Sequence, residues 1–249
     1  MKLLIIIPAY NEAESLKGVI ERLRSTCPQY DYIIVNDGST DGTMELCEEN
    51  NYNIINHTAN EGLSGAIHTG MKYALRNGYD SALQFDADGQ HLPEYIDGML
   101  EVMEKTDCDI VIASRFYKEK MPFRMRTLGG KMISAAIHRT TDKILTDPTS
   151  GMRLYKRNIL RVFAENERFA PEPDTLAFLI RMGADVREVQ VKMNERKYGQ
   201  SYLSPVNATK YMIRILSSIL IFQRKWERIE LAEYEEKQRE SVTADGGKR

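Results

Sequence analysis

The chain has 249 residues, enough for one large domain or two small ones. Its 34 basic and 36 acidic residues give a net charge of −2, which does not favour nucleic acid as a partner. The three cysteines, Cys27, Cys47 and Cys108, lack metal-ligand spacing, so we expect buried free thiols and a reducing, cytoplasmic compartment. The apolar run at residues 3–7 is too short for a signal peptide, and no run reaches the ~18 apolar residues of a membrane span.

The first half of the chain alternates short apolar segments with helical patterns. We predict helices at residues 12–25, 65–76 and 93–104, and another that follows the turn at 37–42 and ends at residue 47. Asn11 is predicted to be the N-cap of the first helix. Strands are predicted before and between them, at residues 3–7, 32–35, 54–56, 81–85 and 109–113. This alternation predicts an α/β fold with a mostly parallel sheet and helices on both faces.

The second half of the chain gives weaker signals. Residues 115–126 read as a basic loop, and residues 194–204 as a polar loop. We predict helices at residues 127–145 and 175–182, and a turn with a strand at 148–154 followed by a strand at 186–191. Residues 227–249 are charged and are expected to form a solvated helix that frays into disorder.

Residues 210–222 form a broad apolar stripe flanked by basic side chains. This pattern fits an amphipathic helix lying in a membrane interface. It also fits a helix packed on the domain, or a contact between two copies of the chain. The charge upstream is uneven: residues 81–110 hold eight acids and one base, and residues 115–143 hold eight bases and two acids. Such a division suits a site for a cation and phosphates, or two solvated helical faces of opposite sign.

The most informative motif is Asp86-Ala87-Asp88, which directly follows the apolar run at residues 82–85. Two carboxylates at this spacing can hold a divalent cation and present it to a diphosphate. An Asp-x-Asp triplet also arises by chance, so its neighbours decide its meaning. In parallel sheets ligands bind beyond the carboxyl ends of the strands. The loops at residues 8–12, 36–43 and 86–91 all follow predicted strands, and we expect them to share one crevice.

With these segments placed, the chain resembles the family 2 glycosyltransferases, nucleotide-sugar enzymes of the GT-A fold, over about residues 1–204. The later motifs, a Thr-Ser-Gly strand and an Arg-x-x-Gly-x-Ser loop, look like those of the dolichyl- and polyprenyl-phosphate sugar synthases. The matching segments are Ile-Pro-Ala-Tyr-Asn-Glu at 7–12, Val-Asn-Asp-Gly-Ser-Thr-Asp-Gly-Thr at 35–43, Asp-Ala-Asp-Gly-Gln-His at 86–91, Ser-Arg at 114–115, Asp-Pro-Thr-Ser-Gly at 147–151 and Glu-Arg-Lys-Tyr-Gly-Gln-Ser at 195–201.

The resemblance implies a GT-A (Rossmann-like) domain at residues 1–204, with a nucleotide-binding half at about 1–115 and an acceptor half at 116–204. We expect a helical extension at 205–235 and a disordered tail at 236–249 after it. The family often has a second acid before Asp37, where this chain has Asn36, and this leaves the choice of base open. The residues expected to bind the nucleotide sugar are Pro8, Tyr10, Glu12, Asp37, Asp86, Ala87, Asp88, Arg115, Arg196 and Ser201.

The resemblance also implies a metal site. Asp86, Asp88 and Gln90 would bind Mg²⁺ or Mn²⁺, which are hard cations that favour oxygen ligands. The metal would neutralise the charge that builds on the leaving nucleoside diphosphate. His91 could be a further ligand, but an all-oxygen site needs no imidazole, so we expect it to support the ligands or the local structure. The other histidines, His57, His68 and His138, have no convergent partners in the sequence and receive no role.

Guanidinium groups bind phosphates through paired, charge-assisted hydrogen bonds, and Arg115 and Arg196 match family motifs for this task. Arg124, Arg126 and Lys131 are candidates on charge density alone, and solvated surface is as good an interpretation. Where the sugar synthases usually have a basic residue after the Gly-x-Ser loop, this chain has Tyr202.

The acceptor decides the mechanism. A sugar hydroxyl needs a general base, whereas a lipid phosphate is already anionic and needs none. Glu172 and Asp174 lie at a predicted helix start, where they could act as base or cap the helix. The sugar synthases usually show an aromatic-acid pair here instead of Pro-Glu-Pro-Asp, so a hydroxyl acceptor stays open.

We therefore expect a metal-dependent inverting glycosyltransferase that moves a sugar from a nucleotide-sugar donor to a polyprenyl phosphate. It would work peripherally at the cytoplasmic face of the membrane, contacting the membrane surface or a membrane protein through residues 205–226, with homo-oligomerisation left open. One alternative is transfer to a glycan or protein hydroxyl with Glu172 or Asp174 as base. Another is a non-catalytic nucleotide-sugar binder that supports a membrane protein. An oxidoreductase is disfavoured, because no Gly-x-Gly-x-x-Gly turn follows the first strand.

Overall fold

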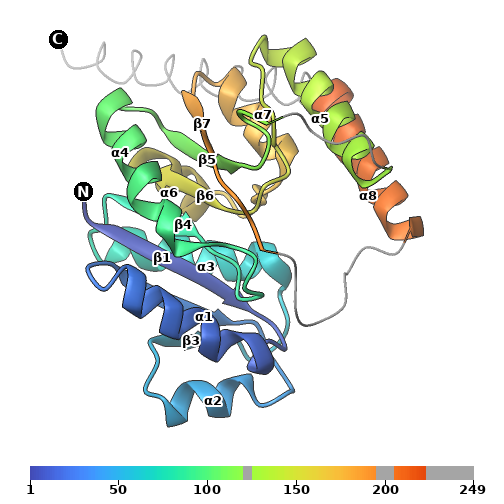
Figure 1. The fold of residues 1–249 in the computed structure, drawn as a ribbon. Helices are drawn as coiled ribbons and strands as arrows, with labels where there is room; N and C mark the ends of the chain where they lie inside the picture. The colour runs from blue at the N-terminus through green and yellow to red at the C-terminus, as the bar shows by residue number, and fades with distance from the viewer. Residues whose placement is uncertain (120–124, 195–204, 223–249) are drawn as a thin grey trace, which may run out of the picture.

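The fold is given by a computed structural model that describes residues 1–119, 125–194 and 205–222. At its centre is a seven-stranded sheet with the order β3-β2-β1-β4-β6-β5-β7 (Figure 1). Every neighbouring pair is parallel except the two pairs that β6 makes with β4 and β5, so the expected mostly parallel α/β class is confirmed. The strands are β1 (Leu3–Ala9), β2 (Asp31–Asn36), β3 (Ile54–Asn56), β4 (Ser81–Gln84), β5 (Ile110–Ser114), β6 (Arg153–Lys156) and β7 (Val186–Gln190).

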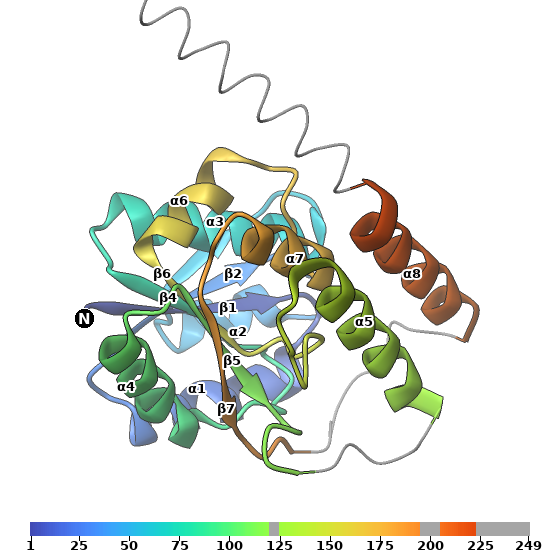
Figure 2. The same ribbon diagram turned by 90° about the horizontal axis from the view of Figure 1, so that it is seen from above.

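Helices cover both faces of the sheet (Figure 2). One apolar cluster lies under α3, α5, α6, α7 and α8, and the other under α1, α2 and α4. The helices are α1 (Ala13–Thr26), α2 (Thr43–Glu49), α3 (Gly62–Arg76), α4 (Ile96–Thr106, after a 3₁₀ turn at Pro93–Tyr95), α5 (Met125–Thr141), α6 (Arg157–Glu165), α7 (Pro173–Arg181) and α8 (Pro205–Ser217, continued by a π-helical turn at Ser218–Phe222).

The central strand β1 shows why the strand positions are readable in the sequence. Leu4 and Ile6 enter the first cluster, and Leu3, Ile5 and Ile7 enter the second. Side chains alternate across a strand, so a strand buried on both faces must be apolar throughout.

Several local expectations are wrong. Asn11 is not the N-cap of α1, because it has a left-handed φ of 56° and its Oδ1 accepts the Thr40 N–H at 2.8 Å. Instead, Asp41 Oδ2 accepts the N–H of Ala13 at 3.1 Å, so the next loop caps α1 from outside. The helix expected at 127–145 ends at Thr141, and the strand expected within 148–154 begins only at Arg153. Helix α6 was not predicted, although its buried face holds Ile159, Leu160 and Phe163.

Helix α8 packs on the domain. Ile215 and Ile219 are fully buried in the first cluster, and Gly129 of α5 lies against Met212. The figures show α8 beside α5 at one edge of the molecule (Figures 1 and 2). Ile213 and Ile221 are 61% and 64% exposed, so packing uses only part of the apolar stripe. Among the described helices, none has the length and apolar character that crossing a bilayer requires.

The three cysteines are buried free thiols, as the sequence predicts. Burial raises the pKa of Cys27 and of Cys47 to about 11, and it also raises the pKa of Cys108. The thiolate is the reactive form of cysteine, so these side chains serve as small apolar core residues.

Candidate active site

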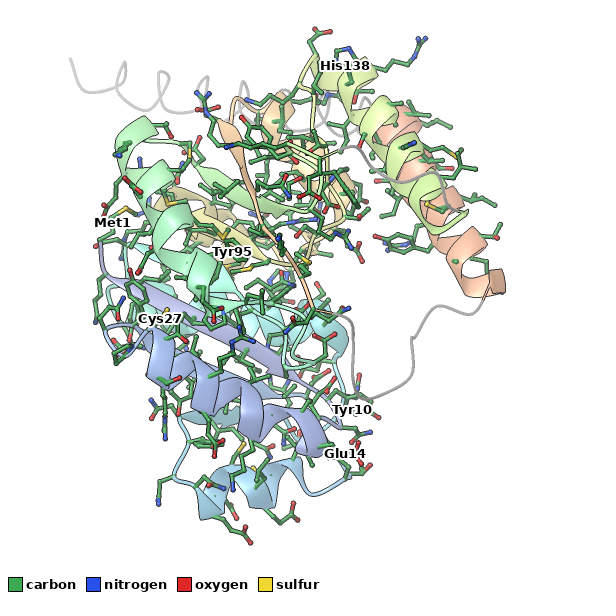
Figure 3. The ribbon with its side chains drawn as sticks, in the orientation of Figure 1. Met1, Tyr10, Glu14, Cys27, Tyr95 and His138 are labelled. Atoms are coloured by element: carbon green, nitrogen blue, oxygen red, sulfur yellow. The ribbon has the colours of Figure 1, made fainter. Side chains whose placement is uncertain are left out.

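The first three site loops meet at one edge of the sheet. The N–H of Asp37 donates to Ala9 O at 2.8 Å, which joins the end of β2 to the end of β1. The N–H of Phe85 donates to Ile6 O at 3.0 Å, which joins β4 to the other side of β1. The chain order reverses between β1 and β4, and such a switch point is where open α/β sheets bind ligands. Tyr10 lies at this edge (Figure 3).

Asp86 is held from behind by His91 and Gly151. The N–H of Asp86 donates to His91 Nδ1 at 2.9 Å, so His91 carries its proton on Nε2, which lies 3.5 Å from Asp86 Oδ2. His91 is 5% exposed, and its ring packs edge-on against Phe85. A Cβ atom on Gly151 would come within 2.9 Å of Asp86 Oδ2. His91 therefore orients the carboxylate, in line with the supporting role expected for it.

Asp88 and Gln90 follow on the same loop. The N–H of Gln90 donates to Asp88 Oδ1 at 3.0 Å, and Gln90 O accepts the N–H of Asn194 at 2.9 Å. Asp88 is buried, and Asp86 keeps a third of its side chain exposed. Among the described residues, no group of three or more acidic, histidine or cysteine side chains could hold a metal.

Two carboxylates and an amide oxygen nevertheless fit Mg²⁺ or Mn²⁺. Mg²⁺ is commonly bound by one or two carboxylates, with substrate phosphates supplying further oxygen ligands. The contact of Gly151 with Asp86 leaves no room for a side chain at position 151, so the carboxylate is confined on that side. The donor set is therefore suited to a metal that binds together with a diphosphate.

Asp37 has a partner that sequence reasoning missed. Its Oδ1 accepts hydrogen bonds from His57 Nδ1 and from the N–H of Glu61, each at 2.9 Å. His57 Nε2 lies 2.9 Å from Thr69 Oγ1 on α3. Asp37 and His57 are twenty residues apart in sequence, so only the approach of β3 to β2 could reveal the pair.

The amide of the neighbouring Asn36 is bonded to two other segments of the protein. Its Nδ2 donates to Asn56 Oδ1 at 2.5 Å, and its Oδ1 accepts the Ser39 N–H at 3.3 Å. The asparagine that departs from the family pattern therefore joins β2, β3 and the loop after β2.

The remaining nucleoside candidates come from the end of β1. Pro8 pairs with Val35 in the sheet, and Tyr10 is partly exposed. Glu12 is the N-cap residue of α1, and its carboxylate accepts the Ser15 hydroxyl at 2.6 Å. Ala87 is 2% exposed and belongs to the core under the loop, so only its backbone could meet a donor.

Arg115 follows β5 and forms a two-pronged ion pair with Asp147. Its Nε lies 2.7 Å from Asp147 Oδ2 and its Nη2 lies 2.9 Å from Oδ1. The hydrogen bond to Asp147 raises the pKa of Arg115 further above its ordinary value. Glu188 in turn accepts the N–H groups of Thr146 and Asp147 at 2.8 Å and 2.9 Å. Asp147, matched by motif but given no role from the sequence, thus fixes the direction of Arg115.

A shallow, open cavity of about 260 Å³ lies between α5 and the residues that follow β5. Its walls combine one cation, two hydroxyl groups and two apolar side chains. The Oγ atom of Ser134 is buried and has no hydrogen-bond partner in the described part of the chain. The lining residues are Phe116, Lys131, Ser134, Leu145 and Thr146.

Glu172 is the N-cap residue of α7, and helix α8 engages its carboxylate. The Tyr211 hydroxyl donates to Glu172 Oε2, and Arg214 Nη2 lies 3.4 Å from Oε1. Burial, together with Glu172, raises the pKa of Tyr211 far above its ordinary value. Asp174 Oδ1 accepts the N–H of Thr175 at 3.1 Å, an arrangement typical of a helix start.

The other candidates cannot be placed. Arg196, Ser201, Tyr202 and Arg124 lie outside the described residues, and so does the side chain of Arg126.

Comparisons with known proteins agree with this architecture. Residues 4–163 match the model of glycosyl transferase family 2. An undecaprenyl-phosphate mannosyltransferase of Micrococcus luteus is 33% identical over 226 residues, which cover 82% of this chain and 88% of the relative. A UDP-N-acetylglucosamine–dolichyl-phosphate N-acetylglucosaminyltransferase of Methanococcus voltae is 30% identical, covering 79% and 87%.

A solved structure shares the fold. Glucosyl-3-phosphoglycerate synthase from Mycobacterium tuberculosis, in complex with Mn²⁺, uridine diphosphate and phosphoglyceric acid, superimposes with a TM-score of 0.62 at 13% identity. The match covers 88% of this chain and 78% of that one.

Proposed function

The chain belongs to glycosyl transferase family 2, and from this premise we propose that it transfers a sugar from a nucleotide-sugar donor to a polyprenyl phosphate at a membrane surface. The relatives named above act on undecaprenyl phosphate and dolichyl phosphate, and this chain spans most of the length of each. The arrangement of the donor loops, the Lys131–Ser134 cavity and Glu172 supports this acceptor class.

The donor would lie along the edge formed by β1, β2 and β4. Asp86, Asp88 and Gln90 would hold Mg²⁺ or Mn²⁺ at its diphosphate, and the metal would offset the charge of the leaving nucleoside diphosphate. Pro8, Tyr10, Glu12 and Asp37 would hold the nucleoside at the adjoining strand ends.

The observation that carries the acceptor assignment is the cavity lined by Lys131 and Ser134. The ammonium group of Lys131 at this cavity suits a phosphate better than a neutral sugar. Phe116 and Leu145 supply apolar walls at the same place, which suits the first part of a lipid chain. Phe116 and Thr146 of the cavity lining are the sequence neighbours of Arg115 and Asp147, and Asp147 holds Arg115 in one orientation.

The chemistry would then need no general base from the protein. An oxygen of the lipid phosphate attacks the anomeric carbon from the side opposite the diphosphate, and the bond from that carbon to the diphosphate breaks. The configuration at the carbon inverts. The engagement of Glu172 by Tyr211 and Arg214 agrees with this route, because both carboxylate oxygens then tie α7 to α8.

Contact with the membrane is assigned to α5 and α8. Both helices carry large exposed apolar side chains and exposed basic ones, a combination typical of an interfacial surface. The apolar set is Leu128, Met132, Ile213, Leu220 and Ile221, and the basic set is Lys131, Arg139, Lys210 and Arg214.

The test is incubation with radiolabelled nucleotide sugars, Mn²⁺ and polyprenyl phosphate in detergent, followed by solvent extraction. We expect label in the lipid phase, loss of transfer in Asp88→Ala, and a rise in the KM for the lipid phosphate in Lys131→Met. Lys105→Met, an exposed lysine of α4, is the matched control and should leave transfer unchanged. Parallel reactions receive a glycan or protein acceptor instead of the lipid phosphate. Label that appears only in those reactions would overturn the proposal in favour of a hydroxyl acceptor.

A further inference from the structure

The two oxygens of the Asp37 carboxylate are not equivalent. Oδ1 accepts two hydrogen bonds, one from His57 and one from the N–H of Glu61. Oδ2 accepts none within the described part of the chain. Asp37 is 3% exposed and lies at the end of β2, where the proposed function puts the nucleoside. A ligand that approaches Asp37 therefore meets one available oxygen rather than two.

His57 is fixed in a state that keeps Oδ1 occupied. Its Nδ1 faces a carboxylate oxygen and must carry a proton to form a hydrogen bond. Its Nε2 faces the Thr69 hydroxyl, which can donate to a neutral imidazole. The side chain of His57 is 9% exposed, so water competes little for either bond.

The segment that carries these donors is held close to Asp37. His57 and Glu61 both belong to the connection between β3 and α3. Gly38, with a φ of +70°, lies so near this connection that a Cβ atom there would be 2.8 Å from Ala59 C and 2.9 Å from Asn60 N. A glycine after Asp37 thus lets the connection close over the carboxylate.

Asn36 adds no second carboxylate beside Asp37, and its amide is directed to Asn56 and Ser39. Bases differ in what they present to such a site. Guanine carries two neighbouring N–H donors that pair with both oxygens of a carboxylate, whereas uracil carries one N–H between two carbonyl groups. Adenine and cytosine place a ring acceptor beside their amino donor, and this acceptor repels an anion.

We infer that His57 is a specificity-determining residue, which makes Asp37 present a single oxygen and so selects a uracil nucleotide as donor. The inference rests on the proposed function for the position of the nucleoside and goes beyond it by naming the base. His57 acts through Asp37 and is a positioning residue.

The experiment is calorimetric titration of the full chain with UDP, GDP and pyrophosphate in the presence of Mn²⁺. For the wild type we expect UDP to bind at least about tenfold more tightly than GDP, since one charge-assisted hydrogen bond contributes about that factor. In His57→Ala the ratio should fall toward one, because Oδ1 becomes available to the second donor of guanine. The exposed His138→Ala on α5 is the control and should keep the wild-type ratio.

The readings separate the two proposals. Equal or tighter binding of GDP by the wild type overturns the uracil assignment, while binding of pyrophosphate with Mn²⁺ leaves the proposed function standing. Failure to bind either nucleotide or pyrophosphate overturns both. An unchanged ratio in a folded His57→Ala overturns the role of His57. If that variant does not fold, Thr69→Val keeps the side-chain shape and should also lower the ratio.

Discussion

Gly151 lies directly against Asp86, because a Cβ atom at position 151 would come within 2.9 Å of Asp86 Oδ2. The same atom would be 3.6 Å from Cε1 of His91. Gly151 shows no positive φ, so this position requires a glycine for space and not for backbone freedom. The turn before β6 thus forms the rear wall of the carboxylate that we assign to the metal.

Replacing Gly151 by alanine should push Asp86 out of its orientation. We expect the Mn²⁺ concentration for half-maximal transfer to rise about tenfold, because a displaced Asp86 would lose about one good contact with the metal. The measurement is the Mn²⁺ dependence of the initial rate. Gly98→Ala is the control, since a Cβ there meets nothing within 4 Å and alanine favours helix α4. An unchanged metal dependence in Gly151→Ala would show that Asp86 is not a ligand.

Glu172→Gln should keep most of the transfer activity. A lipid phosphate needs no general base, and an amide oxygen can still accept from Tyr211, so we expect kcat within about threefold of the wild type. Loss of a general base would instead lower kcat about a hundredfold or more. Tyr211→Phe removes the same hydrogen bond from α8 and is the matched variant. A large drop in Glu172→Gln that Tyr211→Phe does not share would identify Glu172 as the base.

Asp147→Asn should weaken both the fold and the site. Asp147 is 1% exposed and gives both oxygens to Arg115, so we expect the free energy of unfolding to fall by about 2 kcal/mol. The freed Arg115 should also lower kcat/KM about tenfold. Denaturant unfolding and steady-state kinetics measure the two effects. Asp142→Asn, an exposed position with a left-handed φ that asparagine accepts, should change neither.

Asp41→Asn should cost stability only where Asp41 is ionised. Partial burial raises the pKa of Asp41, but hydrogen bonds from Thr43 and Ala13 lower it more, so the net shift is downward. A lowered folded pKa stabilises the protein above the unfolded pKa, and the contribution is lost as the pH falls through the folded pKa. At pH 7 we expect the free energy of unfolding of Asp41→Asn to be about 1 kcal/mol below that of the wild type, a value already discounted for the exposure of the side chain. Near pH 3 the difference between the two proteins should be smaller.

The check on Asp41 is urea unfolding at both pH values, with the exposed Glu48→Gln on α2 as control. A difference that grows on acidification would contradict the assignment of Asp41 as an ionised cap.

Most strands of the sheet could be located from the sequence, because a strand buried on both faces consists of a short run of apolar residues. The sequence did not indicate the direction of β6, whose neighbours β4 and β5 precede it by tens of residues. The apolar positions of α6 are few and lie among charged residues, so the helix was not predicted. The cap of α1 comes from Asp41, which lies on another loop. Direction and capping here depend on tertiary approach, which local patterns do not record.

The candidate site divides in the same way. Asp86, Asp88 and Gln90 share one loop, so the family motif at residues 86–91 was enough to propose them together. The pairs His57–Asp37 and Arg115–Asp147 span twenty and thirty-two residues, and only the folded sheet brings their members together. The binding of Glu172 by Tyr211 spans thirty-nine residues and changes the interpretation of a candidate base.

The position of β6 limits where chimeras between this protein and its relatives can be joined. It runs antiparallel between β4 and β5, so a strand from late in the chain borders the strand that leads to Asp86. A chimera cut near residue 115 would pair the metal loop of one parent with the rear wall of another. A junction after α6 takes β6, the Gly151 turn and the Asp86 loop from a single parent. The family match runs to residue 163 and so ends within α6.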